Sequence, residues 1–381
     1  MTPAPYAAHQ GTSRGRRFAE RPSCYRSDYQ RDRDRILHSR AFRRLMHKTQ
    51  VFATVHGDHH RTRMTHSLEV AQIARTIARC LAVDEDLAES IALAHDLGHT
   101  PFGHIGEKVL DEAMASWGGF SHNIQTFRIL TRLESPYAAF DGLNLTWETL
   151  EGVVKHNGPL LSELPPAIAH YNRVQDLEVD SFPGVEAQVA SLADDIAYNG
   201  HDLDDGLRMG LFSLDDLAGV PVAAAAIREV AECWPDAPLV RKIHETMRKI
   251  IDAQVRDLIE TSRATLAGAR PQSADDVRWH DEPVIGFSEA FADSAAGLKA
   301  WLYTNMYCHE RLRDQTREAG SLLGELFSAF RDDPRLLPVE WKEHLDGCDE
   351  ADRMRLVADY LAGMTDRFAH REHQRLVRQE P

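Results

Sequence analysis

Apolar residues recur every three or four positions over long stretches of this chain, and this spacing constrains the fold more than any other feature. From His66 onward the first such run contains Val70, Ile73, Ala74, Ile77 and Leu81. Residues at this spacing lie on one face of an α-helix. The segment therefore predicts a helix with one buried face.

A second apolar helix is predicted directly after the first. Asp84 is a suitable N-cap, and the helical pattern runs from about Glu85 to Leu97. Gly98 and Pro101 end it. We expect the two helices to form an antiparallel hairpin.

Helical periodicity also dominates the rest of the chain, and alternating strand patterns are scarce. Helices are expected near residues 106–117, 122–134, 146–156, 184–209, 222–232, 237–268, 288–331, 338–346 and 350–377, with a loop at 269–284. Of the 381 residues 43% are hydrophobic, which is enough for a sizeable core. We predict a mostly helical, all-α fold in one globular unit, with an Arg-rich N-terminal segment (1–60), a core (61–210) and a helical C-terminal region (211–381) packed on it.

Charge is unevenly distributed along the chain. The formal net charge of −15 argues against bulk binding of nucleic acid or membranes. Residues 14–44, however, contain eleven arginines and only four acidic residues. These arginines could bind phosphate groups or single-stranded DNA, or they could form a solvated face with local ion pairs.

Cysteine usage and hydropathy bear on where the chain resides. Five cysteines occur, none in a CxxC pair, which indicates a reduced, cytoplasmic protein. The longest apolar run, near residues 222–227, is far below the ~18 residues of a membrane span. We expect no membrane association and no signal peptide.

Two imidazoles and two carboxylates form the strongest chemical signal. His66 begins the first helix of the hairpin and His95-Asp96 lies near the end of the second, so antiparallel packing places them at one level. Asp194 would reach them from a third helix. Such a mixed nitrogen and oxygen set suits Mn, Fe, Ni, Co, Zn or Mg. The alternative is that these are unrelated polar residues at helix ends.

The segment from His95 to Glu107 is dense in ionisable groups. It holds three histidines and two acids, punctuated by Gly and Pro, which favours a tight, specific turn. His104 lies three residues before Glu107, and an imidazole beside a carboxylate can titrate near neutral pH. We interpret His99 and His104 as groups for phosphate contact and acid-base chemistry; the alternative is surface or N-cap histidines.

In these segments the chain resembles the dGTPase-like deoxynucleoside triphosphate triphosphohydrolases of the HD superfamily. The matching segments are SRAFRRL at 39–45, KTQVF at 48–52, RTRMTHSLEV at 61–70, HDLGHTPFGHIGE at 95–107, GGFSHN at 118–123 and ADDIAY at 193–198. The resemblance is dense over about 1–210 and weaker through YTNMYCH at 303–309. It implies an HD-domain helical core with additional C-terminal helices.

The resemblance also implies an activity and a cofactor. The family releases a deoxynucleoside and intact tripolyphosphate, from dGTP or from several dNTPs. One divalent metal ion per subunit, Mn, Mg, Co, Ni or Fe, is held at the positions of His66, His95, Asp96 and Asp194.

On the phosphate side, the resemblance assigns roles to five further residues. Arg63 matches a phosphate contact, and His99 and His104 match active-site histidines near the α-phosphate. Glu107 and His122 match a relay around His104.

The resemblance gives five more assignments, four on the sugar side and one, Lys299, on the phosphate side. Tyr198 packs on the sugar, while Asp202 and Gln50 lie at its 3′-hydroxyl. Tyr307 helps to exclude a 2′-hydroxyl, and Lys299 matches a phosphate-binding position only loosely. The two tyrosines could instead be core aromatics, and Asp202 a surface acid.

Two rival functions remain open at this stage. Another HD hydrolase, such as a 5′-deoxynucleotidase, a cyclic-nucleotide phosphodiesterase or a guanosine-tetraphosphate hydrolase, would share the metal ligands. A regulatory protein that binds dNTP or single-stranded DNA would not need turnover. The resemblance also suggests a homo-oligomer, hexamer or tetramer, and a second dNTP as an allosteric activator.

Overall fold

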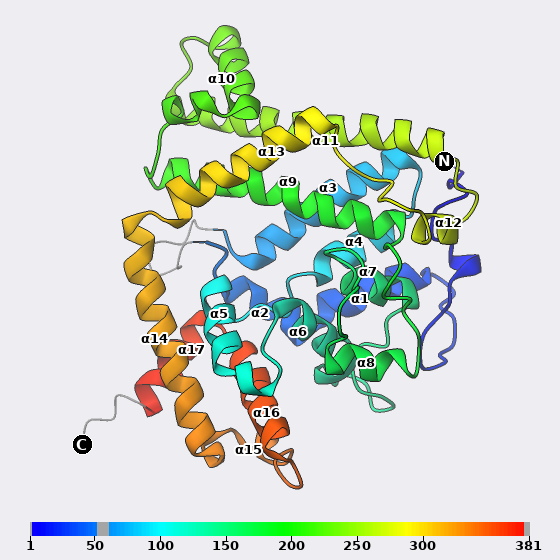
Figure 1. The fold of residues 1–381 in the computed structure, drawn as a ribbon, viewed down its shortest axis with the longest axis vertical. Coiled ribbons are helices and arrows are strands. Elements are labelled where there is room, and N and C mark those ends of the chain that lie inside the picture. Colours follow the sequence, from blue (N-terminus) through cyan, green and yellow to red (C-terminus); the bar gives the residue numbers. More distant parts are fainter. Residues whose placement is uncertain (1, 52–60, 377–381) are drawn as a thin grey trace.

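A computed structural model describes residues 2–51 and 61–376 of the chain, and this part is almost entirely helical (Figure 1). Its only β-structure is two isolated bridges, Arg16 with Thr146 and Thr49 with Thr62. The prediction of an all-α fold is confirmed. The helices of the N-terminal half are α1 Asp28–His38, α2 Arg40–Arg44, α3 Arg63–Leu81, α4 Glu85–Ala94, α5 His104–Ala113, α6 His122–Arg128, α7 Trp147–Val154, α8 Pro166–Asn172 and α9 Val185–Arg208.

The C-terminal half continues the helical pattern. Its helices are α10 Pro221–Cys233, α11 Leu239–Ala269, α12 Ala274–Arg278, α13 Glu289–Leu302, α14 Glu310–Asp332, α15 Val339–Lys342, α16 Glu350–Ala362 and α17 Asp366–Leu376. None of the helices in the described ranges combines the length and the hydrophobicity that a bilayer-spanning segment needs.

The predicted hairpin is α3 and α4, and it packs against α9 in the centre of the molecule (Figure 1). Val70, Ala74 and Ile77 are fully buried in this core, and burial of each large apolar side chain stabilises the fold by about 1.5–3 kcal/mol. Ala82 reverses the chain with φ 58°, and Asp84 accepts a hydrogen bond from the Leu87 amide, as an N-cap does.

Two further apolar clusters attach the C-terminal helices. Leu110 of α5 and Met114 directly after it pack with buried residues of α14 and α16, such as Leu323 and Val357. Leu203, toward the end of α9, packs with residues of α10, α11 and α13. In Figure 1, α14 to α17 therefore lie beside α5 at the lower left, and α10 stands at the top.

Several helix predictions need correction. Helices α1, α2 and α8 were not predicted from the apolar pattern, and residues 269–284, which were predicted to be a loop, contain the short α12. In α1 only three residues are buried, so its apolar periodicity is weak. The stretch 288–331 is two helices, because His309 caps a new one, and 350–377 is interrupted near Gly363.

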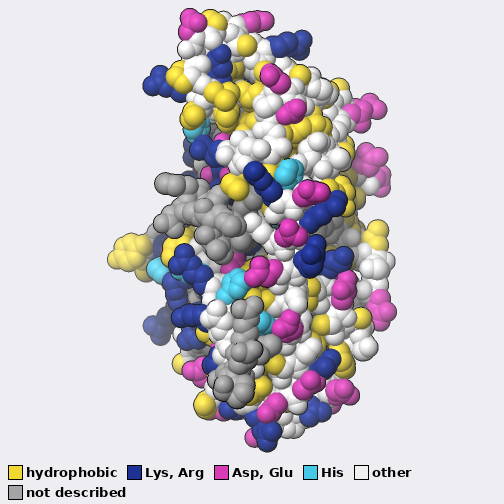
Figure 2. Space-filling model, turned by 90° about the vertical axis from the view of Figure 1, so that its left-hand side faces the viewer, with side chains coloured by type: hydrophobic (Ala, Val, Ile, Leu, Met, Phe, Trp, Pro, Cys, Tyr) yellow, Lys and Arg dark blue, Asp and Glu magenta, His cyan; other side chains and the backbone are white. Residues whose placement is uncertain are grey.

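The arginines of residues 14–44 mostly serve the fold. Six of the eleven form ion pairs with carboxylates: Arg14, Arg16, Arg26, Arg31, Arg33 and Arg35. Asp32 is fully buried, and it is 2.5 Å from the Arg16 guanidinium and accepts the Thr146 amide. On the face in Figure 2, Lys and Arg side chains likewise alternate with Asp and Glu over much of the surface. These six arginines therefore form ion pairs as the alternative expected, but not all on a solvated face: Arg16 and Arg35 are nearly buried, and Arg14 pairs with the distant Glu178.

Glu186 gives a testable pH dependence of stability. Its buried carboxyl accepts the Ala8 and Asp84 amides at 2.9 and 3.1 Å, and burial raises its pKa from 4.5 to about 7. The folded chain therefore binds a proton that the unfolded chain releases, so stability contributed by this group is present below pH 4.5 and is lost as pH rises through about 7.

We predict that Glu186→Gln, which keeps an acceptor oxygen without the charge, raises the melting temperature at pH 8 and has less effect at pH 5. Thermal denaturation across this range measures it, with Glu318→Gln on an exposed position of α14 as the control. A pH-independent difference would contradict the assigned cause.

Candidate active site

The four predicted metal ligands come together where α3, α4 and α9 meet. His66 Nε2 is 2.9 Å from Asp194 Oδ1, and His95 Nε2 is 3.6 Å from the same oxygen. Asp96 Oδ1 is 3.4 Å from His95 Nε2. The Asp194 side chain is 27% exposed while the other three are nearly buried, so the cluster opens to solvent on the Asp194 side.

The contacts of His95 test whether this cluster fits a cation. Its Nδ1 lies 2.6 Å from the Ala92 carbonyl oxygen and donates to it. Nε2 of the neutral ring then carries a lone pair, and it is buried without a hydrogen-bond partner. Carboxylate oxygens of Asp96 and Asp194 lie 3.4 and 3.6 Å from this nitrogen. The lone pair of His95 Nε2 therefore faces other hydrogen-bond acceptors. A divalent cation between them would satisfy all of these groups.

Arg63 provides the permanent positive charge of the site. Its Nη1 is 2.9 Å from Asp96 Oδ2, and both side chains are buried. Burial alone would raise the pKa of Asp96, but Arg63 and the nearby imidazoles hold it well below its usual range. Gly103 has φ +60°, and a Cβ there would lie 2.9 Å from the guanidinium. Only glycine fits this approach without strain.

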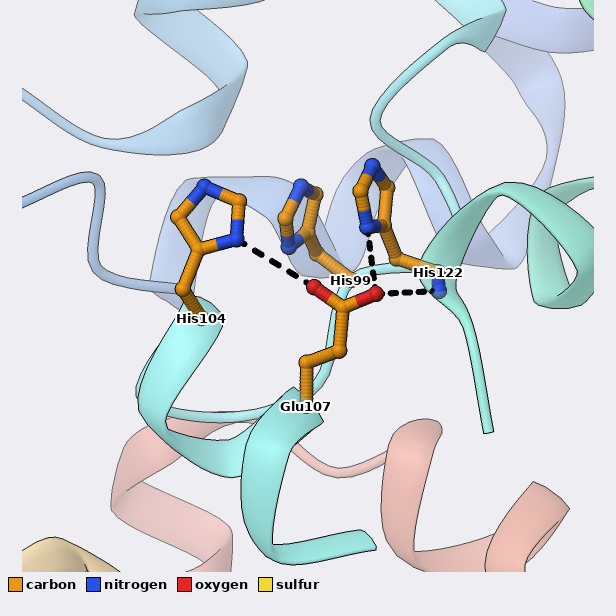
Figure 3. Close-up of side chains that lie close together, drawn as sticks. All are labelled: His99, His104, Glu107 and His122. Carbon is orange, nitrogen blue, oxygen red and sulfur yellow. Dashed lines mark hydrogen bonds and ion pairs between the residues drawn. The ribbon is translucent and has the colours of Figure 1, made fainter. Parts of the chain in front are cut away.

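A second cluster contains the four predicted catalytic residues (Figure 3). His104 Nδ1 is 3.2 Å from one Glu107 oxygen, and His122 Nδ1 is 2.7 Å from the other. The ring of His99 stacks on that of His122 at 3.9 Å between centroids, and its Nε2 is 3.1 Å from Asp96. His99 thus connects the two clusters.

Electrostatics distinguish the members of this second cluster. Burial would raise the pKa of Glu107, but hydrogen bonds from His104 and His122 bring it far below the usual value, so Glu107 stays ionised. Burial lowers the pKa of His99, and Arg63 adds to this effect, so His99 stays neutral. His104 is 62% exposed, which leaves it free to meet a ligand.

Either cluster has the spacing of a metal site. The ligand atoms of His66, His95 and Asp96 lie within 4.8 Å of one another, and so do those of the second cluster. In the second cluster, however, Glu107 is already paired with two imidazoles and with the His122 amide. The first cluster is the better candidate for a cation, because the acceptor of His95 is unpaired there.

The turn that carries the catalytic histidines is held from two distant segments. Lys48 Nζ donates to the carbonyl oxygens of His99 and Ala362 at 2.5 and 2.8 Å. Asp366, at the start of α17, accepts the amides of Phe102 and Thr49 at 3.0 and 2.9 Å. Phe102 has φ 62°, a conformation that costs free energy for a bulky residue. These contacts stabilise it.

The predicted sugar-side residues also meet. Asp194, Tyr198 and Asp202 are spaced four residues apart on α9 and so share one helix face. Tyr307 donates to Asp202 Oδ2, and its hydroxyl also contacts that of Tyr198. The other oxygen of Asp202 is buried without a partner, and burial raises the pKa of Asp202 to about 7. An acceptor is therefore available for a ligand hydroxyl.

The two remaining predicted residues have different surroundings. Gln50 Oε1 is buried without a hydrogen-bond partner. Lys299, in contrast, pairs with Asp195 at 2.6 Å in a partly exposed position. The partner of Lys299 thus directly follows the candidate ligand Asp194 in sequence, and the ammonium group of Lys299 is already paired with it. Phe52 of the KTQVF segment lies outside the described residues.

Two histidines at the site were missed by the sequence analysis. His156 Nε2 is 3.4 Å from Asp194 Oδ2, and its ring stacks on that of His95. His201 contacts His66. The position of His201 two turns after Asp194 on one helix could have revealed it, whereas His156 approaches only through the packing of α7 on the core.

This fold and this arrangement of His66, His95-Asp96 and Asp194 define an HD-domain hydrolase, and the HD domain family matches residues 63–199. The phosphohydrolase-associated domain matches residues 285–375. The chain is 52% identical over 379 residues to a deoxyguanosinetriphosphate triphosphohydrolase-like protein of Parvibaculum lavamentivorans, covering 98% of this chain and 96% of that protein.

Similarly named proteins occur in other bacteria. Identity is 52% over 386 residues with one from Mesorhizobium japonicum, covering 99% of this chain and 96% of the relative. It is 51% over 386 residues with one from Brucella suis, with the same coverage. The chain therefore belongs to the dGTP triphosphohydrolase-like family of HD-domain proteins, as its sequence motifs indicated.

Cation binding should stabilise the fold through Asp194. We predict that Mn²⁺ raises the melting temperature, with about 2.7 kcal/mol of added stability at 100 times the dissociation constant, and that EDTA reverses it. Asp194→Asn should remove this response, and the adjacent, more exposed Asp195→Asn should retain it. Equal responses of the two variants would contradict the assigned ligand set.

The support of the catalytic turn can be tested separately. Asp366→Ala leaves the Phe102 and Thr49 amides without their acceptor, so we expect a loss of about 2–4 kcal/mol in the free energy of unfolding. Urea denaturation measures it. Asp332→Ala at the exposed end of α14 should change stability by less than about 0.5 kcal/mol; a similarly small loss for Asp366→Ala would show that the turn does not depend on α17.

Proposed function

We propose that this chain hydrolyses deoxynucleoside triphosphates at the α-phosphate and releases a deoxynucleoside and tripolyphosphate. One observation carries the proposal: Asp194, Tyr198 and Asp202 follow one another on a single face of α9. This face joins the candidate cation site to a buried carboxylate oxygen without a partner, so a phosphate and a sugar hydroxyl could be bound along one line. The names of the relatives agree with this substrate class.

The residues that would hold the cation are His66, His95, Asp96 and Asp194. A divalent ion bound there would supply Lewis acidity toward a phosphoryl oxygen. Arg63 adds a fixed positive charge beside Asp96. Arg63 is the arginine that we propose for phosphate binding, because it lies within the candidate site itself.

His104 is the proposed acid-base residue. Glu107 is ionised and accepts from His104 Nδ1–H, so Nε2 of the exposed ring is directed away from Glu107 and is available for proton transfer. We propose that water attacks the α-phosphorus in line, that the bond to the 5′-oxygen breaks, and that His104 takes a proton from the water or gives one to the 5′-oxygen. Direct attack by His104 is the less favoured variant, and trapping of a phosphohistidine would establish it.

The sugar would be recognised opposite the phosphate side. The unpaired oxygen of Asp202 is the proposed acceptor for the 3′-hydroxyl. We propose that Gln50, whose Oε1 is also buried without a partner, lies near the same hydroxyl. Tyr198 and Tyr307 are nearly parallel, with ring centroids 6.3 Å apart, and the hydroxyl of Tyr307 is tied to Asp202. We propose that this pair packs on the sugar and leaves no room for a 2′-hydroxyl.

Product analysis tests the proposal against its rivals. The chain is incubated with each dNTP, singly and mixed, in Mg²⁺, Mn²⁺ or Co²⁺, and the anions are separated by chromatography. We expect tripolyphosphate in equal amount to deoxynucleoside. Orthophosphate or pyrophosphate would point to another HD hydrolase, and a metal-replete protein that binds dNTP without turnover would point to a regulatory role.

His104→Ala separates catalysis from metal binding. We predict that it lowers kcat by about 10²- to 10⁴-fold, the usual contribution of a general acid or base, while metal content by elemental analysis stays unchanged. His170→Ala on an exposed position of α8 is the control. Full activity of the His104 variant would remove His104 from the mechanism.

A further inference from the structure

The proposed cation ligand His66 is in contact with a second, buried imidazole. His66 Nδ1 and His201 Nδ1 are 3.1 Å apart. His201 Nε2 in turn is hydrogen-bonded to the Glu69 carboxylate. Glu69 lies on α3 one turn after His66, and His201 lies on α9. The three side chains form a chain from the rim of the site to the candidate ligand.

The order of these contacts fixes where the protons lie. An ionised carboxylate only accepts hydrogen bonds, so His201 Nε2 must carry a hydrogen. Nδ1 of a neutral His201 then has a lone pair and accepts the Nδ1–H of His66. Nε2 of His66 is consequently left with its lone pair, and it is this atom that lies 2.9 Å from Asp194. A cation can bind to His66 through Nε2 only in this tautomer.

The two candidate histidine ligands are held in different ways. His95 Nδ1 donates to the backbone oxygen of Ala92 within its own helix turn. His66 lies in the first turn of α3, and its Nδ1 depends on a side chain from another helix instead. A substitution of His201 removes the hydrogen-bond acceptor of His66. The acceptor of His95 is a backbone oxygen, so no substitution removes it.

Arg61 supports the outer end of this chain. Its Nη1 is 2.9 Å from Asp204 and 2.7 Å from Asp205, both on α9, and its Nε is 3.6 Å from Glu69. The guanidinium therefore joins Glu69 on α3 to the same helix that carries His201. This keeps the Glu69 carboxylate in position although its side chain is 46% exposed.

We infer that Glu69 and His201 are positioning residues that set the tautomer and the orientation of His66, and that cation affinity depends on them. This inference rests on the proposed cation site. It extends that site by two residues that touch neither the cation nor the substrate. Loss of such an outer partner typically costs 10- to 100-fold in metal affinity.

Mn²⁺ affinity of the full chain, measured by calorimetry or electron paramagnetic resonance, tests the inference without any activity assay. We expect His201→Ala to weaken Mn²⁺ binding by about 10- to 100-fold. His201→Asn places an amide oxygen near the Nδ1 position, so it should recover most of the affinity. Asn199→Ala is the matched control, because Asn199 is buried on the same helix but bonds to Gln254 of α11; it should lower stability and leave Mn²⁺ affinity unchanged.

Three outcomes would overturn the inference. His201→Ala could bind Mn²⁺ within a factor of two of the parent, or the Asn variant could lose as much affinity as the Ala variant. If His201→Ala does not fold, Glu69→Ala at the rim replaces it, and unchanged affinity in that variant counts against the inference. A parent chain that binds no Mn²⁺ is a separate case, because it overturns the proposed function together with the inference.

Discussion

The rest of this structure depends on how the charges of two carboxylates, Asp96 and Asp194, are compensated inside a helical core. Asp96 is buried and Asp194 is open on one side only, and a buried negative charge is costly unless it is compensated. Arg63 compensates Asp96 directly, and His66 and His95 direct ring nitrogens at the carboxylates. The apolar seam of α3, α4 and α9 supplies the free energy that holds these groups together, and a divalent cation would complete the balance of charge.

The site is assembled from segments far apart in sequence. The turn after His95 leads into three of the four residues of the candidate catalytic cluster, and Lys48 and Asp366 hold it in place. Residues within the phosphohydrolase-associated domain, 285–375, thereby reach the backbone next to His99 and Phe102. The C-terminal helices are thus part of the scaffold that orients the proposed acid-base residue, in addition to covering α5.

The sequence contained the local features of the fold but few of the long-range ones. Apolar spacing located α3 and α4, and Asp84 marked the boundary, because both signals lie within one helix. Helix α1 was not predicted because its buried face is partly polar and includes Asp32. The family resemblance located Asp194 and the Tyr198, Asp202 and Tyr307 set. Spacing on α9 could have indicated His201, two turns after Asp194, but it could not have indicated His156, which meets Asp194 only through tertiary packing.

The most direct test of this account is the position of the cation. Crystals of the chain grown with Mn²⁺ and measured at the manganese absorption edge would locate it by anomalous scattering. The account predicts one strong peak about 2.2 Å from His66 Nε2, His95 Nε2 and carboxylate oxygens of Asp96 and Asp194. A peak among His99, His104, Glu107 and His122 instead, or none near either cluster, would contradict it.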